Sequence, residues 1–211
     1  NNKLIEVPKG LEKLKNLTYL NLYDNKLTNV KSLEKLTQLD GLVLTENQLT
    51  NVKSLEKLTQ LRGLFLSNNQ LIDVTGLEKL TQLEYLDLSN NKLTSVKGLE
   101  KLTKLEELYL SDNKLTEVPK GLEKLTQLTT LNLGRNKLTN VTGLEKLTEL
   151  ETLYLTINQL TEVPKGLEKL TQLETLYLSE NQLTDVKGLE NLTQLTSLDL
   201  SFNQLTSVKG L

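Results

Sequence analysis

The chain has 211 residues and a formal net charge of −2, and it contains neither cysteine nor histidine. Disulfides, thiol nucleophiles, the common zinc sites and catalytic triads with an imidazole base are therefore excluded. No apolar run approaches the ~20 residues that a membrane-spanning helix needs. The composition predicts a protein that is not an enzyme, needs no cofactor or metal and does not insert into a membrane.

One pattern, Leu-x-x-Leu-x-Leu-x-x-Asn-x-Leu, recurs nine times along the chain at spacings of 22 or 23 residues. Such a fixed period predicts one supersecondary unit stacked on copies of itself, with a core that continues from copy to copy. The asparagines of the pattern are Asn25, Asn47, Asn69, Asn91, Asn113, Asn136, Asn158, Asn181 and Asn203.

Both ends of the chain fall inside repeats. We expect one domain over residues 1–211, with a partial repeat at 1–13, full repeats from Leu14 onward and a last repeat that is incomplete at Leu211. Leucines exposed on two uncapped ends would promote association. The chain is therefore expected to be a monomer when caps are present and able to associate end to end without them.

The first half of each repeat predicts a short strand. Leu108 and Leu110 are two residues apart, so they point to one side of an extended segment, and Glu107 and Tyr109 point to the other. Asn113 ends this strand, and its amide group can both donate to and accept from the backbone of the turn. We therefore expect a strand with one exposed face in every repeat and a structural ladder of buried asparagines.

The second half of each repeat predicts a return segment on the opposite side. Its apolar residues are three or four apart over a stretch too short for an α-helix, which favours 3₁₀ or irregular structure. The longer return segments contain a Val-Pro-Lys-Gly insertion, with prolines at Pro8, Pro119 and Pro164. We expect these prolines to be spacers, because no sheet ladder runs there. A proline-directed docking site is the alternative.

The copies differ from one another mainly at the outward strand positions, where the tyrosines and phenylalanines gather. Tyrosine offers a large contact area and a hydrogen bond with little rotamer entropy to lose, so these positions are candidates for ligand binding. The candidates are Tyr19, Tyr23, Phe65, Tyr85, Asp87, Glu107, Tyr109, Tyr154, Tyr177 and Asp199. The alternative is that aromatic residues simply suit outward strand positions.

Charge is also unequal between the two sides of a repeat. Arg62 and Arg135 are the only basic residues at the variable strand positions, against carboxylates in most repeats. An acidic surface repels phosphate backbones and attracts basic surfaces, so we expect a protein ligand, favour a basic one and do not expect nucleic acid. Charge kept there only for solubility is the alternative.

The motif Leu-x-x-Leu-x-Leu-x-x-Asn-x-Leu-Thr-x-Val, followed by Leu-Glu-Lys-Leu-Thr, covers essentially the whole chain and resembles that of leucine-rich repeat proteins. The resemblance implies an α/β solenoid, a right-handed superhelix of horseshoe shape. Its concave side would be a parallel sheet of short strands, and its convex side would carry 3₁₀ helices and irregular turns. The 22-residue copies resemble bacterial internalins, and the Val-Pro-Lys-Gly copies are similar to 23-residue repeats of other bacterial proteins, such as those of leptospires.

The resemblance to internalins implies a module that binds a protein on its concave face. It implies a role in bacterial adhesion or host interaction and a place outside the cell, secreted or on the cell surface. The 22-residue copies are also similar to a regulatory subunit of protein phosphatase 1, which implies a cytoplasmic scaffold as the alternative. Near-identical copies leave a third interpretation, a structural or consensus-type array without a dedicated ligand.

Overall fold

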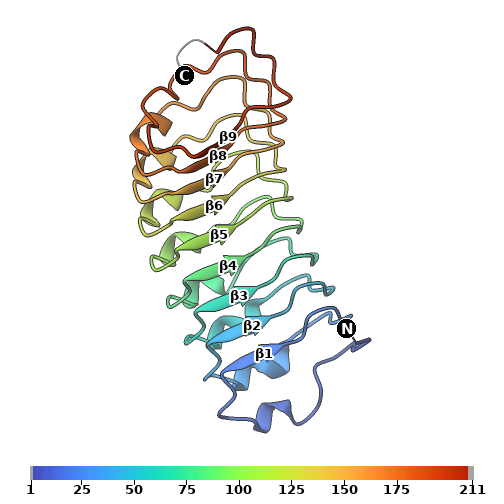
Figure 1. Cartoon of the computed structure of the whole chain (residues 1–211). Helices are drawn as coiled ribbons and strands as arrows, with labels where there is room; N and C mark the ends of the chain where they lie inside the picture. Colours follow the sequence, from blue (N-terminus) through green and yellow to red (C-terminus); the bar gives the residue numbers. More distant parts are fainter. Residues whose placement is uncertain (1, 209–211) are drawn as a thin grey trace.

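The computed structural model describes residues 2–208, which form one coil per repeat (Figure 1). The nine strands of this part of the chain form one parallel sheet in chain order. They are β1 (Tyr19–Asn21), β2 (Gly41–Val43), β3 (Gly63–Phe65), β4 (Tyr85–Asp87), β5 (Glu107–Tyr109), β6 (Thr130–Asn132), β7 (Thr152–Tyr154), β8 (Thr175–Tyr177) and β9 (Ser197–Asp199). The predicted solenoid is confirmed, whereas the incomplete repeat end expected at Leu211 lies outside the described residues.

The register of the sheet does not change where a longer repeat is inserted. Leu86 of β4 pairs with Leu108 of β5, and Leu108 pairs with Leu131 of β6, although the first pair is 22 residues apart and the second 23. The extra residue is accommodated in the return segment, beside Pro119. Outward positions therefore line up in unbroken columns across the whole sheet.

All helices in residues 2–208 are 3₁₀ helices, and they form the row opposite the sheet. They are η1 (Leu11–Lys13), η2 (Lys31–Lys35), η3 (Lys53–Lys57), η4 (Leu77–Lys79), η5 (Leu99–Lys101), η6 (Leu122–Lys124), η7 (Leu144–Lys146) and η8 (Leu167–Lys169). The three-residue helices follow a glycine at positive φ, such as Gly98 at +106°. Where serine replaces that glycine, at Ser32 and Ser54, the helix starts two residues earlier.

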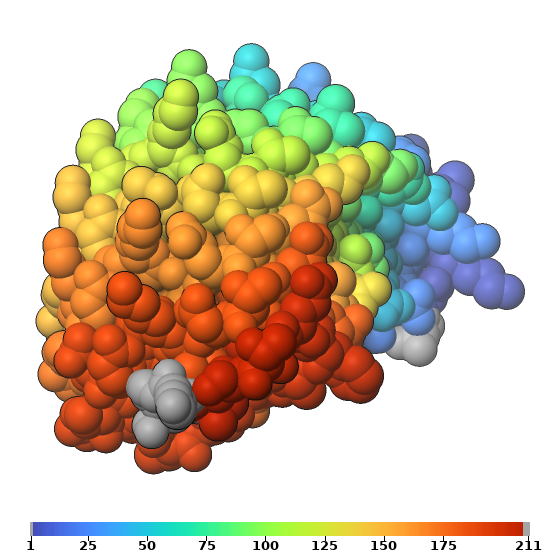
Figure 2. Space-filling model, turned by 90° about the horizontal axis from the view of Figure 1, so that it is seen from above, coloured from blue at the N-terminus to red at the C-terminus, as the bar shows by residue number. Residues whose placement is uncertain are grey.

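The leucines of successive coils form one continuous core. Leu102, Leu105 and Leu108 are fully buried in the middle of the stack, whereas Leu17 and Leu198 near its two ends are only partly buried. Burying one such side chain contributes roughly 1.5–3 kcal/mol, and a middle coil gains this against two neighbours. Figure 2 shows that successive coils are displaced sideways, so the stack curves as the coils accumulate.

Each asparagine of the ladder connects two repeats through the backbone. Asn113 Nδ2 donates to the carbonyl oxygens of Leu88, at 3.0 Å, and Leu110, at 3.2 Å. Its Oδ1 accepts from the N–H of Leu93 at 3.0 Å. The side chain is 8% exposed, so these groups are bonded out of reach of bulk water.

The residue before each ladder asparagine has a left-handed backbone conformation. Its φ is +55° at Ile157 and +52° at Glu180. Asparagine and aspartate tolerate this conformation, whereas a β-branched side chain collides with its own backbone. Ile157 is therefore the strained member of the series.

We expect Ile157→Asn to raise the free energy of unfolding by about 1 kcal/mol, because it relieves this strain at a half-exposed position. Urea unfolding followed by circular dichroism measures the gain. The reverse change in an equivalent turn, Glu180→Ile, should lower stability by a similar amount. An Ile157→Asn protein no more stable than the parent would show that the turn is not strained.

Candidate functional site

The outward strand side chains form two columns. The first column holds Tyr19, Gly41, Gly63, Tyr85, Glu107, Thr130, Thr152, Thr175 and Ser197. The second holds Asn21, Val43, Phe65, Asp87, Tyr109, Asn132, Tyr154, Tyr177 and Asp199. Neighbours within a column come from strands about 4.8 Å apart, so their side chains can touch.

Three aromatic rings meet on β3, β4 and β5 although they come from both columns. The ring centroids of Phe65 and Tyr85 are 4.6 Å apart with the planes at 28°, and those of Tyr85 and Tyr109 are 5.3 Å apart. The Phe65 ring lies over Gly63, beside Tyr85, where a Cβ atom would touch it at 3.4 Å and a larger side chain would stand in its place. The rings are half-buried by one another and remain reachable from the solvent.

Two carboxylates lie among these rings. Asp87 is the register partner of both Phe65 and Tyr109, and Glu107 is the partner of Tyr85. The Tyr109 hydroxyl donates to Glu107 Oε2 at 2.7 Å, and the N–H of Ser89 donates to Asp87 Oδ1 at 2.9 Å. We call Phe65, Tyr85, Asp87, Glu107 and Tyr109 the N-terminal patch.

The tyrosines of the N-terminal patch stay protonated at neutral pH. Burial raises the pKa of Tyr109, and the hydrogen bond to Glu107 and the charge of that carboxylate raise it further. Burial also raises the pKa of Tyr85, with the charge of Asp87 as the next cause. Both phenols therefore stay neutral and keep a proton that they can donate, as Tyr109 does to Glu107.

A second aromatic group lies on β7 and β8. The rings of Tyr154 and Tyr177 meet edge to face, with centroids 5.2 Å apart. Thr152 and Thr175, two residues earlier on the same strands, carry hydroxyl groups in place of charges. We call these four residues the C-terminal patch, and Asn132 of β6 separates it from Tyr109.

Asp199 borders the C-terminal patch as the register partner of Tyr177. Its Oδ1 accepts hydrogen bonds from the Ser201 hydroxyl, at 2.6 Å, and from the Ser201 N–H, at 2.9 Å. These bonds lower the pKa of Asp199, the hydroxyl having the larger effect. The Asp199 carboxylate is thus already hydrogen-bonded within its own turn.

Both arginines of the variable positions are paired along the stack. Arg62 binds Glu84 with two hydrogen bonds, of 2.9 and 2.6 Å, and Arg135 binds Asp112 at 3.2 Å. The hydrogen bond from Arg62 lowers the pKa of Glu84. Sequence reasoning missed these pairs, although partners one repeat apart occupy equivalent positions in adjacent coils.

Two sequence candidates lie outside both patches. Tyr19 on β1 is 57% exposed, and its ring covers Gly41 so closely that a Cβ atom there would be 2.8 Å away. Tyr23 follows β1 in the next turn, and the charge of Glu46 raises its pKa. The structure therefore groups eight of the ten candidates. Five lie in one patch, namely Phe65, Tyr85, Asp87, Glu107 and Tyr109, and the pair Tyr154 and Tyr177 lies in the other, with Asp199 at its border.

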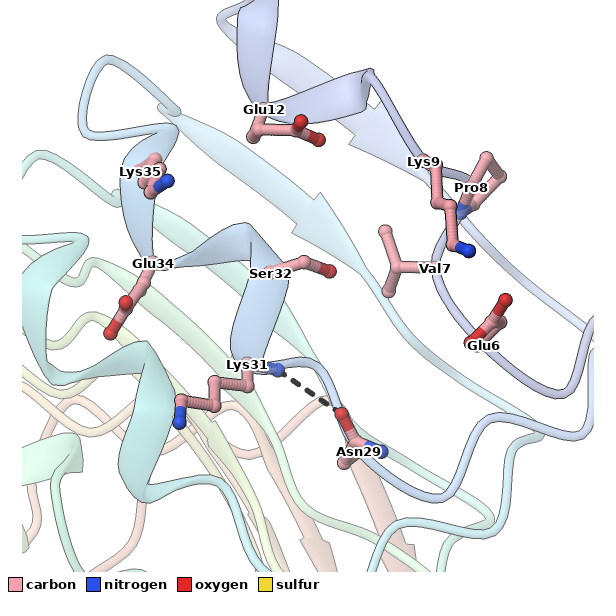
Figure 3. Close-up of a pocket in the computed structure, with 10 residues that line it drawn as sticks. All are labelled: Glu6, Val7, Pro8, Lys9, Glu12, Asn29, Lys31, Ser32, Glu34 and Lys35. Carbon is pink, nitrogen blue, oxygen red and sulfur yellow. Dashed lines mark hydrogen bonds between the residues drawn. The ribbon is translucent and has the colours of Figure 1, made fainter.

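Several hollows in the surface of residues 2–208 lie beside the proline turns. Figure 3 shows one of about 490 Å³, lined by Val7 and Pro8 of the first turn and by Lys31, Ser32 and Glu34 of the next coil, among others. Charges of both signs surround it. Similar hollows adjoin Pro119 and Pro164.

Metal-ligating side chains do not gather in groups of three or more anywhere in residues 2–208. Over the same residues, no helix has the length and apolar character needed to cross a membrane.

Family models described as leucine-rich repeats match most of the chain. A two-copy model matches residues 59–101, 81–124, 103–146 and 126–169, and two further models match residues 16–36 and 148–205. None of the curated proteins compared with the chain matches it.

Solved structures share the architecture over almost the whole chain. A leucine-rich repeat protein of Leptospira interrogans is 36% identical, with a TM-score of 0.94 over 98% of this chain and 54% of its own. Internalin C2 of Listeria monocytogenes is 33% identical, with a TM-score of 0.83 over 87% of this chain and 80% of its own. The plant peptide hormone receptor RGFR1, in complex with RGF2, is 28% identical, with a TM-score of 0.82 over 95% of this chain and 34% of its own. The chain thus spans about half the length of the leptospiral protein, and the expected resemblance to internalins is confirmed.

Proposed function

Because the chain belongs to the leucine-rich repeat family, we propose that it is a protein-binding module whose ligand lies on the concave sheet, across the N-terminal and C-terminal patches. The observation that carries this proposal is the grouping of half-exposed aromatic rings on the sheet, at positions that vary between otherwise similar coils. Such rings provide large, rigid contact areas at protein interfaces. The similar plant receptor, solved in complex with RGF2, supports the assignment.

We further propose a role in bacterial adhesion or host interaction, at the cell surface or after secretion. The two bacterial structures, from Leptospira interrogans and Listeria monocytogenes, support this choice because both are more than 30% identical to the chain. A basic ligand fits the carboxylates of the concave face. The cytoplasmic scaffold remains the alternative that the sequence suggests, and the absence of enzymatic activity remains a prediction.

The double variant Tyr154→Ala/Tyr177→Ala should weaken binding of the natural ligand at least about tenfold, because it removes the rings of the C-terminal patch. The ligand is first captured on the immobilised chain, identified, and then titrated by surface plasmon resonance. Unfolding curves check that both variants keep the fold.

Lys97→Ala/Lys101→Ala is the matched control, since both lysines are exposed on the return side. A captured protein that binds the tyrosine variant as tightly as the parent, or that is lost with the lysine variant, would move the binding site away from the concave face.

A further inference from the structure

We propose that the N-terminal patch is a subsite for a cationic side chain of the ligand, a lysine ammonium or an arginine guanidinium group. The proposal, which rests on the function proposed above, adds the chemical group that the ligand presents and the coils that receive it. It also orients the ligand along the stack, with its basic side chain at β3 to β5 and an uncharged one at β7 and β8.

The patch is a two-by-three arrangement on β3, β4 and β5 in which rings and carboxylates alternate. Its first column is Gly63, Tyr85 and Glu107, and its second is Phe65, Asp87 and Tyr109. Glu107 is the register partner of Tyr85, and Asp87 is two residues from Tyr85 on the same strand. A cation bound at this cluster of rings would therefore meet aromatic side chains together with two carboxylates.

Hydrogen bonds orient both carboxylates and leave each with an oxygen to offer. Tyr109 engages Oε2 of Glu107, and the Ser89 N–H engages Oδ1 of Asp87. In residues 2–208, neither Glu107 Oε1 nor Asp87 Oδ2 accepts a hydrogen bond from a protein group. The patch thus presents fixed acceptors at a surface where the rings exclude part of the water.

No lysine or arginine in residues 2–208 forms an ion pair with Asp87 or Glu107. The three ion pairs found in residues 2–208 are Lys57 with Glu34, Arg62 with Glu84 and Arg135 with Asp112. Arg62 and Arg135, the arginines nearest in sequence, are therefore already paired with other carboxylates. A ligand cation would supply the missing positive charge.

The C-terminal patch lacks this combination of groups. Thr152 and Thr175 stand beside its rings, and the neighbouring Asp199 is hydrogen-bonded to Ser201. A cation there would meet aromatic faces without a carboxylate that needs a partner. This difference favours a basic side chain at β3 to β5 and an uncharged one at β7 and β8.

A peptide of four lysines with blocked ends is the probe, titrated into the isotopically labelled chain at low salt and followed by nuclear magnetic resonance. The largest shifts are expected at the N-terminal patch. Asp87→Asn/Glu107→Gln should weaken the peptide about fivefold or more, and Tyr85→Leu about three- to fivefold. A peptide of four glutamines should not bind.

Glu151→Gln/Glu174→Gln is the matched control, since it removes the same charge from exposed positions beside β7 and β8. It should change the affinity less than about twofold. Equal losses for the two double variants would reveal a general acidic field in place of a subsite, and absence of binding or shifts confined elsewhere would also overturn the proposal. The titration needs no natural ligand, so its failure leaves the test with Tyr154 and Tyr177 independent.

Discussion

Replacing Asn113 by alanine is expected to lower the free energy of unfolding by about 3 kcal/mol. The change removes hydrogen bonds to four backbone groups, the carbonyls of Leu88, Leu110 and Ser111 and the N–H of Leu93. Alanine offers no replacement, and the neighbouring leucines keep water away from these groups. Each orphaned group then carries a desolvation penalty.

The position of the asparagine in the stack should set the size of this loss. Asn203, beyond β9, makes equivalent bonds to Leu178, Leu200 and Leu183, but they are only partly buried. Water can replace them, so Asn203→Ala should cost about 1 kcal/mol. Urea unfolding of both variants measures the difference. Equal losses would mean that the ladder does not depend on burial.

The fold was predictable because every structural position is repeated along the chain. Spacing by two placed Leu108 and Leu110 inside, and the fixed asparagine marked the end of each strand. A pattern that recurs in every copy defines both the period and the register of the strands. The shift between three-residue and five-residue helices was not predicted, although it follows from serine in place of glycine at Ser32 and Ser54.

The candidate face was predictable in its positions and not in its contacts. Outward columns follow from strand alternation, and so does the separation of Tyr109 from Tyr154 by Asn132. The diagonal contact between Phe65 and Tyr85 depends on ring rotamers and on the space beside Gly63, which spacing does not determine. The contacts that define the two patches therefore could not be predicted from the sequence alone.

Gly76→Ala is expected to lower the free energy of unfolding by about 3–4 kcal/mol, well beyond the cost of the same change at Gly143. Both glycines precede a three-residue helix, and their φ values are +100° and +105°. A side chain at either position adopts a backbone conformation that costs about 1–2 kcal/mol. Their surroundings differ, however. A Cβ atom at Gly76 would lie 2.9 Å from the Cα of Lys53, whereas one at Gly143 would have no atom within 4 Å.

The collision at Gly76 involves backbone, which cannot move aside as a flexible side chain can. Lys53 is the first residue of the longer helix η3, so Gly76 lies where a short helix follows a long one. If η3 causes the collision, Ser54→Gly should recover part of the loss in Gly76→Ala and none in Gly143→Ala, which urea unfolding of the two double variants measures. Equal costs at the two glycines, or equal effects of Ser54→Gly in both backgrounds, would show that the backbone conformation alone determines the penalty.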